Sequence, residues 1–160
     1  MPTPTQTLHA DIAALLPRLH RFARSLTWSR EDADDLAQLA LERALQRSGQ
    51  WQQGTRLDSW IFRIMKNAWI DVVRGRARRA RLFVPEAEGE QVGDDTARLH
   101  QHRLALRQAL GMLNEEQRKV IGLVLVEGLP YKEAARVLRI PVGTLTSRLA
   151  RARGVLRTLL

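Results

Sequence analysis

The chain has 160 residues, no cysteine, a formal net charge of +9 and a pI of about 11.3. This length allows one domain or two small ones, and the absence of cysteine excludes disulfide bonds and thiolate metal sites. The positive charge favours a polyanionic partner, nucleic acid before an anionic membrane surface.

The sequence carries no sign of a membrane segment. No apolar run is long enough to cross a bilayer, and the N-terminal residues lack the basic leader and apolar core of a signal peptide. We therefore expect a cytoplasmic protein without membrane insertion.

Charge is unevenly distributed along the chain. Residues 31–42 and 86–95 are acidic, whereas residues 56–81 and the chain from Arg136 onward are basic. Two basic segments separated by an acidic one are consistent with two separate contacts with nucleic acid.

The first part of the chain predicts two or three helices. Residues 8–27 carry apolar side chains at helical spacing, and Pro17 either kinks this helix or marks a new start. Ser29 is a predicted N-cap, followed by acidic residues that the helix dipole favours in a first turn. This next helix is expected to end near Gln46.

A further helix is predicted from about residue 57. Thr55, with Asp58 three residues later, resembles a capping box. Residues 57–73 then carry two apolar stripes. Either the helix is buried on both sides or it bends near Asn67, because asparagine is a weak helix former and a frequent cap.

The remaining chain begins with a segment that lacks periodicity. Residues 82–97 are rich in Glu, Gly and Asp and are predicted to form a flexible acidic linker. Helical spacing resumes at Leu99, Asn114 is a predicted N-cap, and Gly128 is the expected end of the helix that follows. With no strand signal, we predict an all-α protein of two small helical domains, residues 1–81 and 98–160.

The C-terminal stretch predicts a helix-turn-helix. Residues 131–138 form a short amphipathic pattern, Pro141 interrupts it, and a second helix is predicted from Val142. The second helix has one apolar stripe and an opposite face of small, hydroxylic and cationic side chains. Such a face can approach phosphates and base edges in the major groove. The alternative is an arginine-rich, solvated helix in a small bundle.

Four segments in order carry a family resemblance. They are residues 32–38 (DADDLAQ), 57–67 (LDSWIFRIMKN), 113–118 (LNEEQR) and 143–149 (GTLTSRL). Together they resemble the small, extracytoplasmic-function (ECF) sigma factors of bacterial RNA polymerase over nearly the whole chain. The resemblance departs at Leu39, where the family usually has an acid, and at Pro130, where it often has a capping serine.

The resemblance implies a function in transcription initiation. The N-terminal domain would bind core RNA polymerase and open the downstream promoter element, and the C-terminal domain would read the upstream element as duplex. Core RNA polymerase, promoter DNA and an anti-sigma factor are the implied partners. The chain is then not an enzyme, and we expect no catalytic residue, cofactor or metal.

The resemblance also implies three sets of binding residues. The set for the upstream duplex comprises Thr144, Thr146, Ser147, Arg148, Ala150 and Arg151. The set for the downstream element and its melting comprises Arg56, Trp60, Arg63, Lys66, Asn67 and Arg74. The set for polymerase comprises Asp32, Asp35, Leu36, Gln38 and Glu42.

Simpler interpretations stay open for several of these residues. Helical spacing places Ser147, Ala150 and Arg151 outward, but an arginine can contact phosphate rather than a base. Trp60 lies on an apolar stripe, so it either packs in the core or stacks on a base, and Asn67 is either a cap or a base contact. The acids at 31–35 are more simply helix-dipole partners than metal ligands.

A stand-alone helix-turn-helix regulator is the competing function. It would account for residues 113–157 and leave the 57–67 segment without a role, and a requirement for core polymerase would distinguish the two. A metal-dependent nuclease is a more distant possibility, because the sequence shows no nucleophile paired with a base.

Overall fold

The structure is a computed structural model that describes residues 1–81 and 97–159. The N-terminal half contains α1 (Pro4–Ala14), α2 (Leu16–Thr27), α3 (Arg30–Gln46), a short 3-10 turn η1 (Ser48–Gln50) and α4 (Leu57–Ala80). The C-terminal half contains α5 (Ala97–Gly111), α6 (Glu115–Ile121), a π-helical turn η2 (Gly122–Val126), α7 (Tyr131–Leu138) and α8 (Val142–Leu159). The described residues form no strand, which confirms the all-α prediction.

Most predicted helix starts are confirmed. Ser29 accepts a hydrogen bond from the Asp32 N–H, and Asn114 forms a reciprocal capping box with Gln117. Pro17 begins a new helix, because α1 ends at Ala14 and α2 starts one residue before the proline. A proline is tolerated there because the first turn of a helix needs no partner for its N–H.

The predicted capping box at Thr55 is wrong. Helix α4 begins at Leu57 with Arg56 as its N-cap and no side-chain cap bond. The Thr55 hydroxyl instead donates to the Gln52 carbonyl at 2.6 Å, and the Asp58 carboxylate binds arginines. Thr55 and Asp58 are residue types of a capping box, but in the folded chain the Asp58 carboxylate is paired with Arg18 and Arg56.

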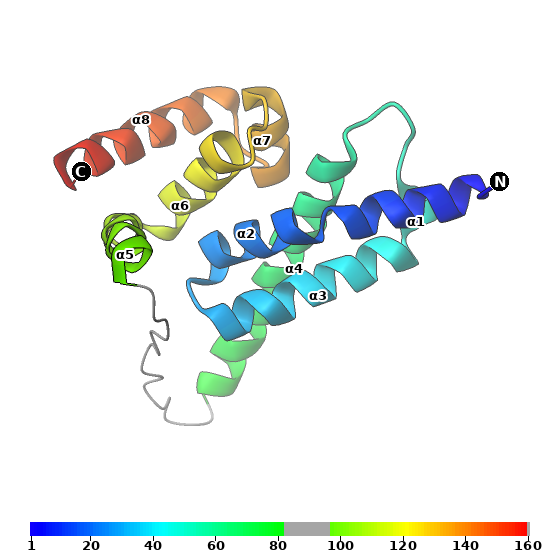
Figure 1. The fold of residues 1–160 in the computed structure, drawn as a ribbon, viewed down its shortest axis with the longest axis horizontal. Helices are drawn as coiled ribbons and strands as arrows, with labels where there is room; N and C mark the ends of the chain where they lie inside the picture. Colours follow the sequence, from blue (N-terminus) through cyan, green and yellow to red (C-terminus); the bar gives the residue numbers. More distant parts are fainter. Residues whose placement is uncertain (82–96, 160) are drawn as a thin grey trace.

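Helix α4 is the centre of the N-terminal half, where it packs against α2 and α3 (Figure 1). It is one continuous helix of 24 residues, so the bend considered at Asn67 does not occur. Its two apolar stripes are both used: Ile61, Phe62 and Met65 are fully buried, and Trp69 is 8% exposed. Burial on several sides therefore explains the double stripe.

The C-terminal half contains the predicted helix-turn-helix. Helices α7 and α8 pack together, and Ala134 and Val137 of α7 and Leu145 and Leu149 of α8 are buried. Arg139 adopts a left-handed conformation at the end of α7, and the chain turns there into α8. Gly128, with φ of +69°, ends the preceding segment as expected, because glycine adopts this conformation without steric cost.

The two halves pack against each other in the described residues. Helix α6 lies against α2, and α7 lies against α4 (Figure 1), so the buried apolar residues form one continuous cluster. The predicted linker, residues 82–97, lies outside the described residues except for Ala97 at the start of α5. The domain boundaries at 81 and 98 stay predictions.

Candidate nucleic-acid interface

Helix α8 presents the first predicted DNA-binding face. Leu145, Leu149 and Ala152 are buried on one side, and this leaves Ser147, Ala150 and Arg151 exposed on the other, as their spacing predicted. A helix with this division can bind a groove of duplex DNA without any rearrangement of its own core.

The other members of the upstream set lie at the margin of this face. Thr144 and Thr146 are half-buried, and the Thr146 hydroxyl donates to the Gly143 carbonyl at 2.9 Å. Arg148 donates to Glu116 of α6, also at 2.9 Å. Arg148 therefore has an intramolecular partner in this arrangement, whereas Arg151 is a more accessible cation.

The predicted melting residues on α4 are much less accessible. Trp60, Arg63 and Asn67 are half-buried, and Lys66 is only 6% exposed. Helix α7 packs on α4, so the C-terminal half lies over part of this segment. Because Lys66 is buried in this arrangement, its ammonium group is not accessible to a DNA phosphate.

Burial and nearby cations act on Lys66 in the same direction. Desolvation lowers the pKa of Lys66 below that of an ordinary lysine, and the cations Arg139, Lys119 and Arg63 lower it further, against a smaller opposite effect of Glu116. A cation held among other cations indicates that this side of the α4–α7 contact is electrostatically unfavourable.

A groove opens at the same place between α4 and the helix-turn-helix. It has a volume of about 480 Å³ and is lined by Arg63, Lys132, Ala135, Arg136, Arg139, Ile140, Pro141 and Val142. Four of these lining residues are cationic and none is acidic. The groove therefore combines cations from both predicted DNA-binding elements.

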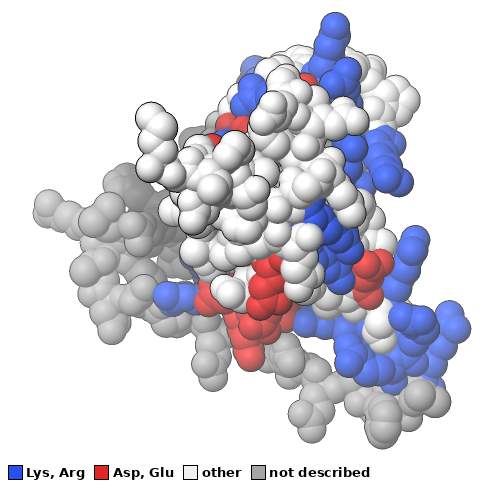
Figure 2. All heavy atoms as spheres, turned by 90° about the vertical axis from the view of Figure 1, so that its right-hand side faces the viewer, with Lys and Arg blue, Asp and Glu red and all other residues white. Residues whose placement is uncertain are grey.

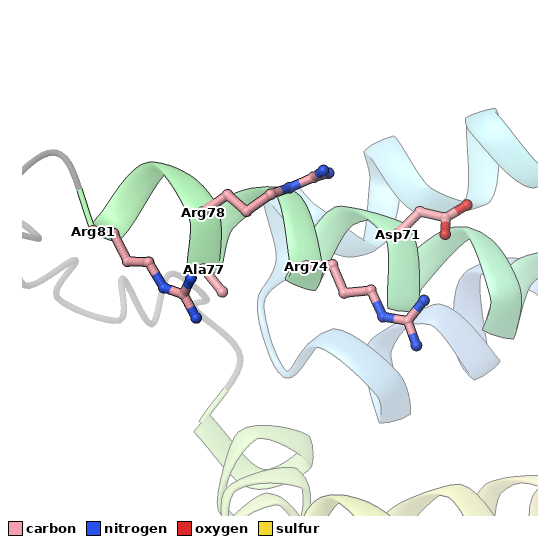
Figure 3. A pocket seen from close by; sticks show the side chains of 5 residues that line it. All are labelled: Asp71, Arg74, Ala77, Arg78 and Arg81. Atoms are coloured by element: carbon pink, nitrogen blue, oxygen red, sulfur yellow. The ribbon is translucent and has the colours of Figure 1, made fainter.

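The C-terminal end of α4 carries the other basic surface. Arg74, Arg78 and Arg81 follow one another along its last turns and line a shallow hollow of about 500 Å³ with Asp71 and Ala77 (Figure 3). Arg74 of the melting set lies here, exposed. Unlike Lys66, these arginines remain open to solvent and available to phosphates.

Helix α3 carries the residues predicted to bind polymerase. Asp35, Gln38 and Glu42 are exposed, at the spacing of one helical face. Asp32 instead forms a bidentate salt bridge with Arg76 of α4, whose two terminal nitrogens donate to its carboxylate oxygens at 2.6 and 2.9 Å. Leu36 does not share this surface: it is 3% exposed because it packs in the core, so it positions the helix.

On the face drawn in Figure 2, basic side chains gather toward one side of the view and an acidic patch lies beside them. In the described part of the chain, no three His, Asp or Glu side chains converge as metal ligands would, and no helix is long and apolar enough to cross a membrane.

Comparisons with known proteins identify the family. Residues 12–66 match the family model of the Sigma2 domain of PhyR, and residues 103–156 match Sigma-70, region 4. The ECF RNA polymerase sigma factor EcfG of Rhodopseudomonas palustris is 36% identical over 98% of this chain and 86% of its own length. The chain belongs to the ECF RNA polymerase sigma factors. This is a family of transcription initiation factors, and the resemblance seen in the sequence is confirmed.

Other relatives agree over both halves of this sigma factor. SigM of Mycobacterium tuberculosis is 36% identical and covers 89% of this chain and 71% of its own. The solved structure of the sigma factor RpoE in complex with the anti-sigma factor NepR from Bartonella quintana matches with a TM-score of 0.77, 29% identity and 94% coverage of each chain. A second structure, CnrH in complex with the cytosolic domain of CnrY, matches with a TM-score of 0.68 at 28% identity, covering 95% and 86%.

Sequence reasoning missed the residues that join the two halves. Glu127 has a fully buried side chain that binds Arg18 and Arg21, although it stands alone at the end of an apolar helix. Trp28 contacts the C-terminal half from the end of α2. A single acid between an apolar run and a glycine was the available signal for Glu127, but its arginine partners lie more than 100 residues earlier.

Proposed function

We propose that this sigma factor binds core RNA polymerase, reads the upstream promoter element with α8 and opens the downstream element with α4. The observation that carries the proposal is the exposed face of α8, with Ser147, Ala150 and Arg151 opposite a buried apolar stripe. An arginine on such a face can bind guanine or phosphate. The order of the two halves along the chain agrees with the matched sigma-region families.

The melting role is supported by the chemistry of α4. Opening a duplex requires cations for the loose strand and a surface that holds an unstacked base, and base–aromatic stacking contributes roughly 1–3 kcal/mol per base. Arg63, Trp60 and Asn67 lie on neighbouring turns of α4 and are partly accessible. Arg56 at the start of α4 and Arg74 near its end add exposed positive charge.

The proposed partners follow from the family and its solved complexes. Core polymerase would contact the exposed face of α3 that carries Asp35, Gln38 and Glu42. An anti-sigma partner is proposed because both solved neighbours are complexes of a sigma factor with another protein, NepR in one and CnrY in the other. We propose that the protein acts in the cytoplasm, where polymerase acts.

Reconstituted transcription tests this function. The purified chain is mixed with core RNA polymerase on a library of genomic fragments, and the RNA start points are mapped. We expect defined start points that appear only when both proteins are present. Specific duplex binding without polymerase, and no transcript with it, would favour the stand-alone regulator instead.

A further inference from the structure

A buried carboxylate joins the two halves of the chain. The Glu127 side chain has no exposed surface, and its oxygens accept hydrogen bonds from Arg18 Nε at 2.8 Å and from Arg21 Nε and Nη2 at 3.0 and 3.2 Å. Arg18 Nη2 also donates to the Glu127 carbonyl at 3.1 Å. A buried acid is tolerable only while such partners remain, because removing them leaves an uncompensated charge.

The same arginine extends the contact to α4. Arg18 Nη1 binds Asp58 at 3.1 Å, and Asp58 is also held by Arg56. Burial acts to raise the pKa of Asp58, but the hydrogen bonds from Arg56, the Ser59 N–H and Arg18 outweigh it and lower that pKa. Arg18, Arg21, Asp58 and Glu127, hereafter the Glu127 cluster, thus link α2, α4 and the segment after η2.

A close helix approach lies beside this cluster. A Cβ atom placed on Gly122 would lie 2.8 Å from Ser25 Oγ and 3.6 Å from a ring carbon of Phe22. With Ser25 in place, a side chain there would require the Ser25 hydroxyl, which donates to the Phe22 carbonyl, or the helices themselves to shift. Gly122 has ordinary helical geometry, so its absent side chain matters for this contact rather than for its backbone.

An aromatic contact completes the attractive part of the interface. The ring of Trp28 lies 5.7 Å from the Arg107 guanidinium and 5.1 Å from that of Arg118, within the range of a cation–π interaction. The ring also lies against Gly111, where an added Cβ would be 3.4 Å from it. Residues of α5 and α6 therefore bind the end of α2 with defined geometry.

The α4–α7 side of the interface has the opposite character. Lys66 and Arg63 of α4 lie near Arg139 at the end of α7, and the buried Nε of Arg63 has no hydrogen-bond partner. Like charges and an unsatisfied donor both cost free energy when water is excluded. The packing of α7 on α4 is therefore not stabilised by these charges, and the Glu127 cluster, Gly122 and Trp28 supply attractive contacts elsewhere in the same interface.

We propose that the free chain adopts this arrangement of the two halves, hereafter the closed form, as an autoinhibited state. In it, the Glu127 cluster keeps α7 over the melting segment of α4, residues 57–67, until the two halves separate. The proposal rests on the melting role assigned to α4 under the proposed function. Lys66 is buried and Arg63 and Asn67 are half-buried in the closed form, so a displaced DNA strand cannot reach all of them at once.

The test uses a disulfide, because the natural chain has no cysteine. A Cβ placed on Gly122 would lie 3.3 Å from Ser25 Cβ, which is slightly shorter than the usual Cβ–Cβ distance of about 3.5–4.5 Å in a disulfide. The double variant Ser25→Cys/Gly122→Cys should therefore form a bond across the interface under mild oxidation. The oxidised full chain is then mixed with core polymerase and promoter DNA, without reductant, and compared with the reduced sample.

We expect the oxidised chain to lose promoter opening, measured by permanganate footprinting, and dithiothreitol to restore it. The variants Ser25→Cys and Gly122→Cys alone control for each substitution and for oxidation itself. Equal opening by the oxidised and reduced double variant would overturn the proposal. So would failure of the cysteines to react with each other while each remains accessible to a thiol reagent.

A second measurement is independent of the cysteines. Small-angle scattering of the free chain should show a larger radius of gyration for Glu127→Gln than for wild type, and an unchanged radius would count against the cluster as the closing contact. Failure of the proposed function looks different, because wild type itself would then start no transcript with core polymerase. An inhibitory closed form predicts an active wild type and an inactive oxidised variant.

Discussion

Helices α4 and α8 are both predicted to bind DNA, yet their predicted binding residues are not equally accessible in the structure. The outward residues of α8, Ser147 and Arg151 among them, are exposed, whereas Lys66 is buried and Asn67 half-buried on α4, a helix that packs against α7. An amphipathic helix such as α8 needs only one side for its core. Helix α4 has two apolar stripes and is buried on several sides, so little of its surface remains for DNA.

DNA binding by α4 can therefore be regulated by the packing of the two halves, whereas DNA binding by α8 is independent of it. A duplex reader is complete once its own small domain has folded, because its binding face is independent of the core beneath it. A melting segment that shares its surface with the other half depends on the distance between the halves. Four variants test this difference between α4 and α8.

The largest effect is expected for Glu127→Gln. The variant leaves Arg18 and Arg21 without their shared carboxylate, and because both are partly exposed we expect a loss of about 2–3 kcal/mol, below the full cost of a wholly buried pair. Urea unfolding measures the change. The control Glu115→Gln removes an exposed acid paired with Lys119 within α6 and should change stability by about 0–0.5 kcal/mol.

The next effect concerns α8. We expect Arg151→Ala to weaken upstream-element binding by polymerase holoenzyme by about 1–3 kcal/mol, because an exposed arginine on this face contacts a base or phosphate. Titration of a labelled duplex at moderate salt measures the affinity. Arg47→Ala removes the same charge from an exposed site at the end of α3 and should bind normally. Equal affinities for both variants would remove Arg151 from the site.

A smaller effect, specific to strand opening, is expected for Asn67→Ala. The residue is half-buried on α4. We expect open-complex formation to fall about tenfold, because the loss of one base contact costs about 1.4 kcal/mol. The far-ultraviolet circular dichroism should be unchanged. A template with a pre-melted downstream element should restore transcription. Loss on both templates would instead assign Asn67 to another step, and normal activity on both would exclude it.

The smallest effect is expected for Lys66→Met. Replacing a buried cation near Arg63 and Arg139 with an apolar side chain of similar length should stabilise the closed form by about 1 kcal/mol. The pH dependence gives a second signature. The folded-state pKa of Lys66 lies below the ordinary 10.5, so the unfolded chain binds more protons between the two values. Wild-type stability should gain a rising contribution with pH in that window, and the variant should lack it.

Local features were predictable because their causes are local. Ser29 and Asn114 have the side chains of N-caps, and Pro141 interrupts a helix wherever it follows one. The outward residues of α8 followed from helical spacing alone. Thr55 shows the limit of this reasoning, because the acid that completed its cap pattern binds Arg18 and Arg56 instead.

The candidate site was only partly predictable for the same reason. Arg63, Lys66 and Asn67 were identified from their types and from the family resemblance, but their accessibility depends on the elements packed against α4, among them α7, which begins 64 residues after Asn67. Leu36 was assigned to the polymerase surface by its motif and is buried by the fold. A motif specifies residue types, and only packing decides which of them reach the surface.

The all-helical fold, the C-terminal helix-turn-helix with its cationic outward face, and membership of the sigma factor family could be inferred before folding was considered, because caps, periodicity and motif order are properties of neighbouring residues. The contact of Glu127 with the N-terminal half and the position of α7 over α4 became visible only in the folded chain. The physical reason is that a buried ion cluster and a close helix approach at Gly122 depend on residues about 100 positions apart, and no local pattern records that they meet.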